Sequence, residues 1–252
     1  MSDAITAPSK ALLLLEGRAV WELGALYALW PLLRLAPRGD GHPVMVLPGM
    51  GAGDFSTRPL RRFLRDRGYR AHGWRAGRNI GSEAIAGRLM HRLRHLRNRY
   101  ARPVSLIGWS LGGYYARELA RRMPDDVRLV ITLGTPFAAP AKASNVWALY
   151  EYLSGRKAED DAARLAFLRE APPAPFTSIY SRSDGIVAWQ GCLEQPGPRA
   201  ENIEVRGSHS GLGHNPLALY AIAHRLAQPA GQWTPFERRG ITALLYPDPQ
   251  RS

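Results

Sequence analysis

One serine of the chain has surroundings that fit a catalytic nucleophile. Ser110 lies in the run Gly108-Trp109-Ser110-Leu111-Gly112, which follows an apolar segment of strand character and precedes a segment of helical periodicity. A sharp turn between strand and helix strains the backbone at the serine, and glycines on both sides leave room for close packing. The start of the following helix directs backbone N–H groups towards negative charge. The pattern predicts a nucleophilic serine, although Gly-rich turns of this length also occur without catalysis.

Candidates for a base and an acid follow two later segments of strand character. His209 comes soon after residues 201–205, and Asp184 comes soon after residues 176–180. A serine hydroxyl becomes a good nucleophile when a histidine within hydrogen-bond reach takes its proton. A carboxylate can hold that histidine in the required tautomer. We therefore expect Ser110, His209 and Asp184 to act together.

Two other residues compete for these roles. His214 stands in the same loop as His209, but His209 comes sooner after the strand. We expect His214 to cap the helix predicted over residues 216–226 instead. Glu204 competes with Asp184, but it lies inside an expected strand and would point along the sheet rather than off its end.

A Gly-rich turn over residues 48–54 follows a buried strand expected over residues 44–47. It departs from the dinucleotide-binding fingerprint, because Asp54 stands where the last glycine is required, and no lysine of a phosphate-binding loop is present. An exposed backbone N–H in this turn could instead hold an oxyanion. Asp54 itself is expected to be a turn residue beside the site.

Segments of strand and helix character alternate along the chain. The expected strands cover residues 44–47, 69–74, 104–107, 127–133, 176–180 and 201–205, and the expected helices cover 56–67, 83–100, 114–122 and 216–226. This alternation predicts an α/β fold with a mostly parallel sheet of about six strands flanked by helices. Ligands of such folds gather at the carboxyl ends of the strands. Met50, Ser110, Asp184 and His209 all follow expected strands, so they are expected at this one edge.

Residues 138–175 interrupt the alternation with aromatic side chains, a charged segment and prolines. An insertion of this kind between two strands is typical of a helical cap over the strand ends. Trp147 and Tyr150 of the insertion, together with Trp109, are candidates for binding an apolar acyl chain. The aromatic residues of the cap could equally serve only to fix the cap to the domain.

Residues 1–36 are expected to form an N-terminal apolar helical extension, and residues 37–252 the main domain. Within residues 11–35 no apolar span of about 20 residues is complete, because charged residues interrupt it at Glu16, Arg18 and Glu22. The flanking residues lack the features of a signal peptide, so we expect a cytoplasmic protein. The segment either packs on the domain, which we favour, or lies on a membrane surface as an amphipathic helix.

The chain of 252 residues has a formal net charge of +13, which could attract a membrane, a nucleic acid or an acidic substrate. Almost all of the positive charge is arginine, since the lysines are only Lys10, Lys142 and Lys157. No cluster interleaves arginine with exposed aromatic residues as a nucleic-acid-binding surface would. We therefore expect solvated arginines and no nucleic-acid partner.

Few residues have the spacing of a metal site. His91 and His95 lie four positions apart on an expected helix, which is a spacing that can bind metal, but no third ligand accompanies them. We expect a surface pair, with no metal or organic cofactor. Cys192 is the single cysteine, so no intrachain disulfide forms.

These motifs resemble the α/β-hydrolase superfamily, with the best match to lipase-like bacterial esterases over about residues 44–226. Residues 108–113 are similar to that family's nucleophile turn, residues 183–187 to its acid loop, and residues 208–212 to its histidine loop. One departure is Pro48-Gly49, where many of these lipases carry His-Gly. This departure affects the loop geometry and the substrate preference that the resemblance implies.

The resemblance implies an α/β-hydrolase fold with a helical cap and a serine esterase activity. Ser110 would be the nucleophile, His209 the base and Asp184 the orienting acid, and the backbone N–H groups of Met50 and Leu111 would form the oxyanion hole. The expected substrate is a small-molecule or lipid carboxylic ester, cleaved through an acyl-enzyme on Ser110. No cofactor is implied.

Two alternatives to the esterase stay open. An acyltransferase or thioesterase would use the same triad, because the acceptor is chosen by cap shape and water exclusion. A non-catalytic basic protein on a hydrolase scaffold would bind an anionic membrane, with peripheral contact through residues 11–35. The presence of all the expected triad residue types argues against this second alternative.

Overall fold

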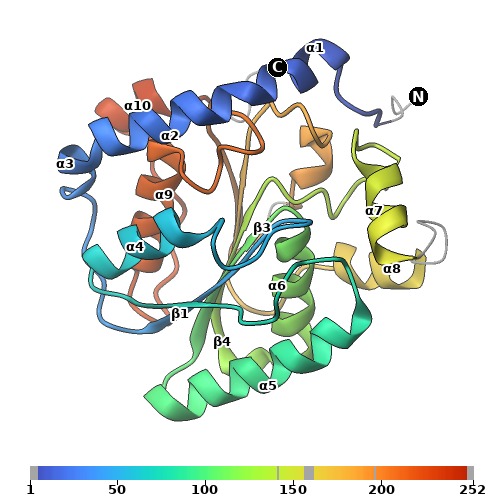
Figure 1. Cartoon of the computed structure of the whole chain (residues 1–252). Helices are drawn as coiled ribbons and strands as arrows, with labels where there is room; N and C mark the ends of the chain where they lie inside the picture. The colour runs from blue at the N-terminus through green and yellow to red at the C-terminus, as the bar shows by residue number, and fades with distance from the viewer. Residues whose placement is uncertain (1–4, 141, 156–161, 196, 249–252) are drawn as a thin grey trace.

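A parallel sheet of six strands runs through the middle of the molecule, in the order β2-β1-β3-β4-β5-β6 (Figure 1). The computed structural model describes residues 5–140, 142–155, 162–195 and 197–248. The strands are β1 (Pro43–Leu47), β2 (Arg70–Gly73), β3 (Val104–Trp109), β4 (Val127–Leu133), β5 (Phe176–Tyr180) and β6 (Ala200–Glu204). Every pair of neighbours in the sheet is parallel. The predicted α/β architecture is confirmed, with each strand close to its expected position.

Helices cover both faces of this sheet (Figure 1). The helices between strands and after the sheet are α4 (Arg58–Asp66), α5 (Glu83–Tyr100), α6 (Leu111–Arg122), α7 (Trp147–Ser154), α8 (Ala162–Arg169), α9 (Pro216–Leu226) and α10 (Ile241–Leu245). The N-terminal segment consists of α1 (Lys10–Leu14), the 3₁₀ turn η1 (Leu15–Arg18), α2 (Ala19–Ala28) and α3 (Trp30–Leu33). Two further 3₁₀ turns are η2 (Pro124–Asp126) and η4 (Trp189–Cys192).

The alternation of side chains along the strands divides the core into two layers. In β1, Val44 and Val46 belong to the layer beneath α4 and α9. Met45 and Leu47 belong to the opposite layer, beneath α5 and α6. The apolar stripe of α5 is fully buried in this second layer, as its spacing predicted: Ile85, Leu89, Leu93 and Leu96. Both faces of β1 are therefore apolar, which explains the continuous apolar run of this strand in the sequence.

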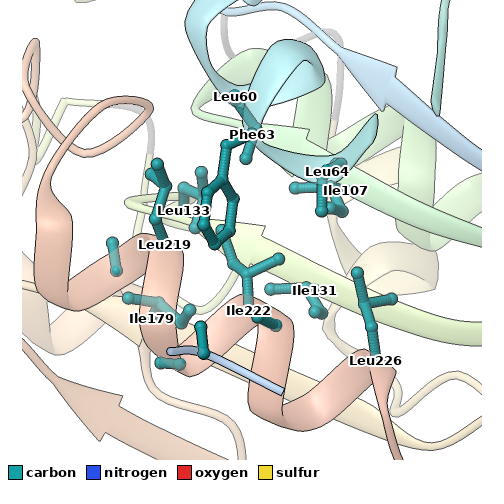
Figure 2. Packing of buried hydrophobic residues seen from close by; sticks show 14 of the residues in the cluster. Leu60, Phe63, Leu64, Ile107, Ile131, Leu133, Ile179, Leu219, Ile222 and Leu226 are labelled. Atoms are coloured by element: carbon teal, nitrogen blue, oxygen red, sulfur yellow. The ribbon is translucent and has the colours of Figure 1, made fainter. Parts of the chain in front are cut away.

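The first layer joins segments from both ends of the chain. Figure 2 shows Phe63 of α4 and Ile222 of α9 packed over strand residues such as Ile131. Leu26 and Leu33 of the N-terminal segment are buried in the same cluster. The segment therefore packs on the domain, which is the alternative that we favoured from sequence. The division of the chain at residue 36 stays a prediction.

The cap predicted over residues 138–175 contains α7 and α8, and residues 141 and 156–161 of it lie outside the described residues. One buried arginine of α6 holds the end of this cap. Arg117 donates from Nε to the carbonyl of Leu168 at 2.7 Å and from Nη2 to the carbonyl of Glu170 at 3.0 Å. Its Nη1 pairs with Glu194 at 2.5 Å, and the guanidinium stacks on Phe137 at 3.8 Å. The carboxyl end of α8 is thereby fixed to the core.

We expect Arg117→Met to destabilise the fold. Methionine fills a similar volume but leaves the buried Glu194 carboxylate without its partner, and the loss of one member of a buried pair typically costs about 3–5 kcal/mol. Urea denaturation of the two proteins measures the difference. Arg122→Met is the matched control, because Arg122 pairs with Glu118 at 3.1 Å while half-exposed, and such pairs contribute less than about 1 kcal/mol. Equal losses in both variants would contradict the anchoring role of Arg117.

Candidate active site

Ser110 occupies a strained turn between β3 and α6. Its backbone angles are φ 51° and ψ −121°, a conformation that is costly for a residue with a side chain, by about 1–3 kcal/mol. A side chain at position 108 would overlap the backbone of Gly113, and one at position 112 would overlap the carbonyl of Leu47. The glycines that flank the serine are therefore needed for the space that they leave. The sharp strand-to-helix turn expected from the sequence is present.

The Ser110 turn is tied to the end of β4. The N–H of Ser110 donates to the carbonyl of Leu133 at 2.8 Å. The Thr135 hydroxyl donates to the carbonyl of Ser110 at 2.8 Å. A side chain at position 113 would overlap Thr135, so Gly113 also contributes to this close packing. The residues on both sides of Gly134 thus fix the backbone of the serine.

A buried histidine and aspartate form a hydrogen-bonded pair at the same edge of the sheet. Nδ1 of His209 lies 2.6 Å from Oδ2 of Asp184, and the two residues are only 6% and 2% exposed. The other carboxylate oxygen accepts hydrogen bonds from the N–H groups of Ile186 and Val187, each at 2.8 Å. Because Nδ1 faces the carboxylate, Nε2 lies on the opposite side of the ring. Both oxygens of Asp184 are engaged, so its carboxylate has a fixed orientation.

The imidazole and the serine turn meet at the end of β4. A Cβ placed on Gly134 would lie 2.9 Å from Nδ1 of His209, so the ring packs directly on this glycine. The indole N–H of Trp109, the neighbour of Ser110, donates to the carbonyl of His209 at 3.1 Å. The structure therefore brings Ser110, His209 and Asp184 to one edge of the sheet. Their catalytic roles stay a prediction.

The surroundings of His209 raise the pKa of its imidazole. Burial alone would lower this pKa, but the charge and the hydrogen bond of Asp184 and the charge of Glu16 outweigh burial. The net direction is upwards from the ordinary value of about 6.5. A base must be neutral to accept a proton, so any activity that needs His209 as base should be lost as the pH falls through this raised pKa.

The two competing residues are engaged elsewhere. Nε2 of His214 lies 2.9 Å from the carbonyl of Ala19 in α2. The expectation that His214 caps the closing helix is wrong: the side chain of Asn215 caps α9, accepting from the N–H groups of Leu217 and Ala218. An amide oxygen one residue later in the chain is a better acceptor for these N–H groups. Glu204 pairs with Arg182 at 3.0 Å, within the end of β6.

The Gly-rich turn after β1 lies beside the serine. A Cβ on Gly49 would be 3.5 Å from Cβ of Ser110, and Met50 follows directly. Leu111 is the first residue of α6, and the first N–H groups of a helix have no partner inside it. The turn that carries Met50 follows β1, and the helix start at Leu111 follows β3, so both lie beside the serine. The assignment of their N–H groups to an oxyanion hole stays a prediction.

A residue that sequence reasoning missed holds this turn in place. The buried Asn79 donates from its side chain to the carbonyl of Pro48 at 2.8 Å. Its backbone carbonyl accepts from Gly51 at 2.7 Å, and its N–H donates to Ala52 at 2.8 Å. Asp54 is a turn residue, as expected, and accepts from the N–H of Trp74 at 3.0 Å. An asparagine in a loop gives no signal of this role until its partners are known.

The three aromatic residues predicted to bind substrate lie in different surroundings. The ring of Trp109 packs against Gly213 of the histidine loop, and Tyr150 of α7 packs against Gly81. Trp147 is half-buried at the start of α7. Their roles in substrate binding stay predictions.

In the part of the chain that the structure describes, no group of three or more His, Cys, Asp or Glu side chains could hold a metal ion. His91 and His95 are both exposed on α5. Over the same residues, no helix has the length and apolar character to cross a membrane.

One curated protein is similar in sequence to part of this chain. No protein-family model matches the chain. A pimeloyl-[acyl-carrier protein] methyl ester esterase of Shewanella woodyi is 29% identical over 115 residues, which are 46% of this chain and 44% of that protein. The chain thus matches less than half the length of this curated relative.

Solved structures extend the similarity to most of the chain. Lipase B of Aspergillus fumigatus has a TM-score of 0.58 at 17% identity, covering 75% of this chain and 53% of the lipase. An esterase of Pyrococcus furiosus has a TM-score of 0.55 at 15% identity, covering 75% and 82% of the two chains. An α/β serine hydrolase homologue from Coxiella burnetii has a TM-score of 0.52 at 17% identity, covering 75% and 88%. The chain has the α/β-hydrolase fold. Because the sequence identities are low, these structures show the shared fold and not a shared activity.

In this α/β-hydrolase fold we expect Asp184→Asn to lower the pKa of His209, because the variant removes the charge that raises it. NMR titration of the imidazole measures this shift directly, and the acid limb of kcat/KM for an ester should move to lower pH with it. The value of kcat should fall by about 10⁴-fold, since an amide no longer fixes the tautomer. Glu204→Gln is the control and should leave the titration unchanged. An identical titration in wild type and Asp184→Asn would contradict the pairing.

Proposed function

We propose that the chain is a serine hydrolase that cleaves carboxylic esters through an acyl-enzyme on Ser110. One observation carries the proposal: the strained serine turn and the Asp184-bonded imidazole of His209 share the end of β4, through Gly134 and its neighbours. A turn that holds its serine in a costly conformation is typical of a functional site. The esterases and lipases among the similar proteins support the same reaction class.

The reaction begins with proton transfer to His209. Nε2 accepts the proton of the Ser110 hydroxyl as Oγ attacks the carbonyl carbon of the ester. The electron pair of the carbonyl moves onto its oxygen, and the N–H groups of Met50 and Leu111 stabilise that oxyanion, each by roughly 2.7–4 kcal/mol. The tetrahedral intermediate then collapses to the acyl-enzyme, and the alcohol leaves with the proton from Nε2. Water repeats these steps and releases the acid.

Asp184 acts through His209 in this scheme. Its carboxylate accepts a hydrogen bond from the Nδ1–H group, which keeps the proton of the neutral imidazole on Nδ1 and leaves Nε2 able to act as base. It also stabilises the imidazolium that forms after proton transfer. The N–H groups of Ile186 and Val187 hold the carboxylate in place.

Acyl transfer to an alcohol or a thiol would use the same three residues. The choice between water and another acceptor depends on water exclusion by the cap, and part of the cap lies outside the described residues. Product analysis of an ester reaction with added alcohol distinguishes the two. We propose hydrolysis, so we expect the free acid as the main product.

We expect the wild-type protein to react stoichiometrically with a fluorophosphonate probe, and Ser110→Ala to lose the label. The phosphonate needs an activated serine, and kcat for an ester should fall by roughly 10⁶-fold in the variant, as in serine proteases. Mass spectrometry of the labelled peptide locates the site. Ser9→Ala, at an exposed serine before α1, provides a serine control with labelling retained. A folded wild-type protein that takes up no probe would contradict the proposed function.

We also propose that the outer face of the N-terminal segment contacts an anionic lipid surface. The exposed apolar side chains are Leu14, Leu15, Val20, Trp21, Tyr27, Leu32 and Leu35. The two acidic residues of positions 10–35, Glu16 and Glu22, face the protein, whereas Lys10 and Arg34 are exposed. An exposed apolar strip with flanking cations is suited to an anionic membrane surface. Figure 1 shows the segment extended along one side of the molecule.

We expect the triple variant Leu14→Ser, Trp21→Ser, Leu35→Ser to bind vesicles containing anionic lipid at least about tenfold more weakly than wild type. These three side chains are 84%, 82% and 81% exposed, so their loss removes apolar area from the contact without disturbing the core. Co-sedimentation measures the binding. Tyr152→Ser on α7, which is 84% exposed, is the control. Unchanged binding in the triple variant would rule out contact through this face.

A further inference from the structure

The charged residues that interrupt the N-terminal apolar region contact both loops that carry the histidine and the aspartate. Oε1 of Glu16 accepts hydrogen bonds from the N–H groups of Gly185 and His209, both at 2.9 Å. Oε2 accepts from the N–H of Ser210 at 2.9 Å. One carboxylate from η1 therefore binds the residue after Asp184, the histidine itself and the residue that follows it.

Two neighbouring side chains extend this contact. Arg18 donates to the carbonyl of Ser183 at 2.6 Å and to its hydroxyl at 2.9 Å. Glu22 accepts from the N–H and the hydroxyl of Ser208, both at 2.8 Å. Arg18 and Glu22 also pair with each other at 3.3 Å. Residues 183–185 and 208–210 are thus joined to one short stretch of the N-terminal segment.

Glycines in both loops leave the space for this contact. A side chain at position 185 would overlap the carbonyl of Leu12 in α1, and one at position 211 would overlap the carboxylate of Glu22. Neither glycine has a positive φ, so these positions require glycine for its small size and not for its backbone conformation. Gly24 of α2 is different, since a Cβ there would meet nothing within 4 Å.

The charge of Glu16 is maintained by these hydrogen bonds. Burial alone would raise the pKa of Glu16, but the N–H donors of Ser210, Gly185 and His209 lower it below its ordinary value. The charged groups that face His209 are Asp184 from the acid loop and Glu16 from η1, and both raise the pKa of the imidazole. Glu16 therefore has an electrostatic effect on His209 besides its hydrogen bonds.

We propose that Glu16 is a positioning residue for the reaction, and that Glu16, Arg18 and Glu22 form an N-terminal clasp that holds the acid and histidine loops together. This inference rests on the proposed function. A clasp of this kind fixes the backbone on both sides of the Asp184–His209 hydrogen bond. Catalysis depends on that geometry, because a misplacement of about 1 Å can cost 10²-fold in rate.

Glu16→Gln tests the clasp with little change in volume. The amide keeps one acceptor oxygen, presents an NH₂ group where Oε2 accepted the N–H of Ser210, and carries no charge. We expect kcat for a soluble ester to fall by roughly 10²-fold with KM little changed. The acid limb of kcat/KM should move to lower pH, because the imidazolium of His209 loses a nearby negative charge. Glu237→Gln removes an equal charge at a distant exposed site and is the control.

A glycine pair tests the same contact by steric means. Gly185→Ala should push the acid loop away from Leu12 and lower kcat, whereas Gly24→Ala adds the same methyl group to α2 without a contact. Thermal unfolding of all variants separates loss of fold from loss of positioning. A Glu16→Gln protein with wild-type kcat and an unshifted acid limb would overturn the proposal. So would equal kcat in Gly185→Ala and Gly24→Ala.

Failure of the clasp and failure of the proposed function give different results. A wild-type protein without fluorophosphonate labelling would show that the hydrolase proposal is wrong. A wild-type protein that is labelled and hydrolyses esters, with Glu16→Gln labelled at the same rate, would remove the clasp alone. We expect Glu16→Gln to be labelled more slowly than wild type and Glu237→Gln at the wild-type rate.

Discussion

The hydrogen bond between His209 and Asp184 is the interaction on which the candidate site depends. A carboxylate that is 2% exposed is costly to bury unless donors surround it. The imidazole and two backbone N–H groups supply these donors. The position of the imidazole is in turn determined by Gly134, because no larger residue leaves room for the ring. The packing at the end of β4 therefore determines where the imidazole lies, and with it the geometry of the His209–Asp184 hydrogen bond.

The parallel sheet makes this arrangement available. Serine, aspartate and histidine each follow a different strand, and parallel strands place their carboxyl ends at a common edge. The loops beyond that edge are then fixed by residues from elsewhere: Asn79 for the turn at Met50, and the N-terminal segment for the other two loops. Backbone groups provide most of the partners in these contacts. The loops are thus held by a few polar side chains from other parts of the chain, and glycines in the loops leave the space for these contacts.

The elements of the fold were predictable because their signals are local. The apolar stripe of α5 and the apolar runs of the strands are buried, and each pattern can be read within its own segment of the sequence. The serine turn was predictable because the tight packing of its backbone requires glycine at two positions that lie within two residues of the serine. The parallel arrangement of the sheet followed from the alternation of strands and helices, whereas the order of its strands was not predicted.

The contacts between distant segments were not predictable. In the sequence, Glu16 is a charge that interrupts an apolar run, whereas in the structure it binds residues 169 to 194 positions away. The role of Asn79 likewise depends on a turn that precedes it by a whole strand and helix. The helix cap at Asn215 is different, because asparagine before proline at a helix start is a local signal that favours it over His214.

The position of the N-terminal segment also affects how the chain acquires its structure. Leu26 and Leu33 are synthesised before every strand of the sheet, yet they pack with α9, which follows the last strand. Domains acquire their structure during synthesis at about 5–20 residues per second, so these side chains spend many seconds without their partners. Through that interval the nascent polypeptide exposes an apolar surface that a chaperone can bind. The N-terminal segment can therefore complete its packing on the domain only after α9 has been synthesised.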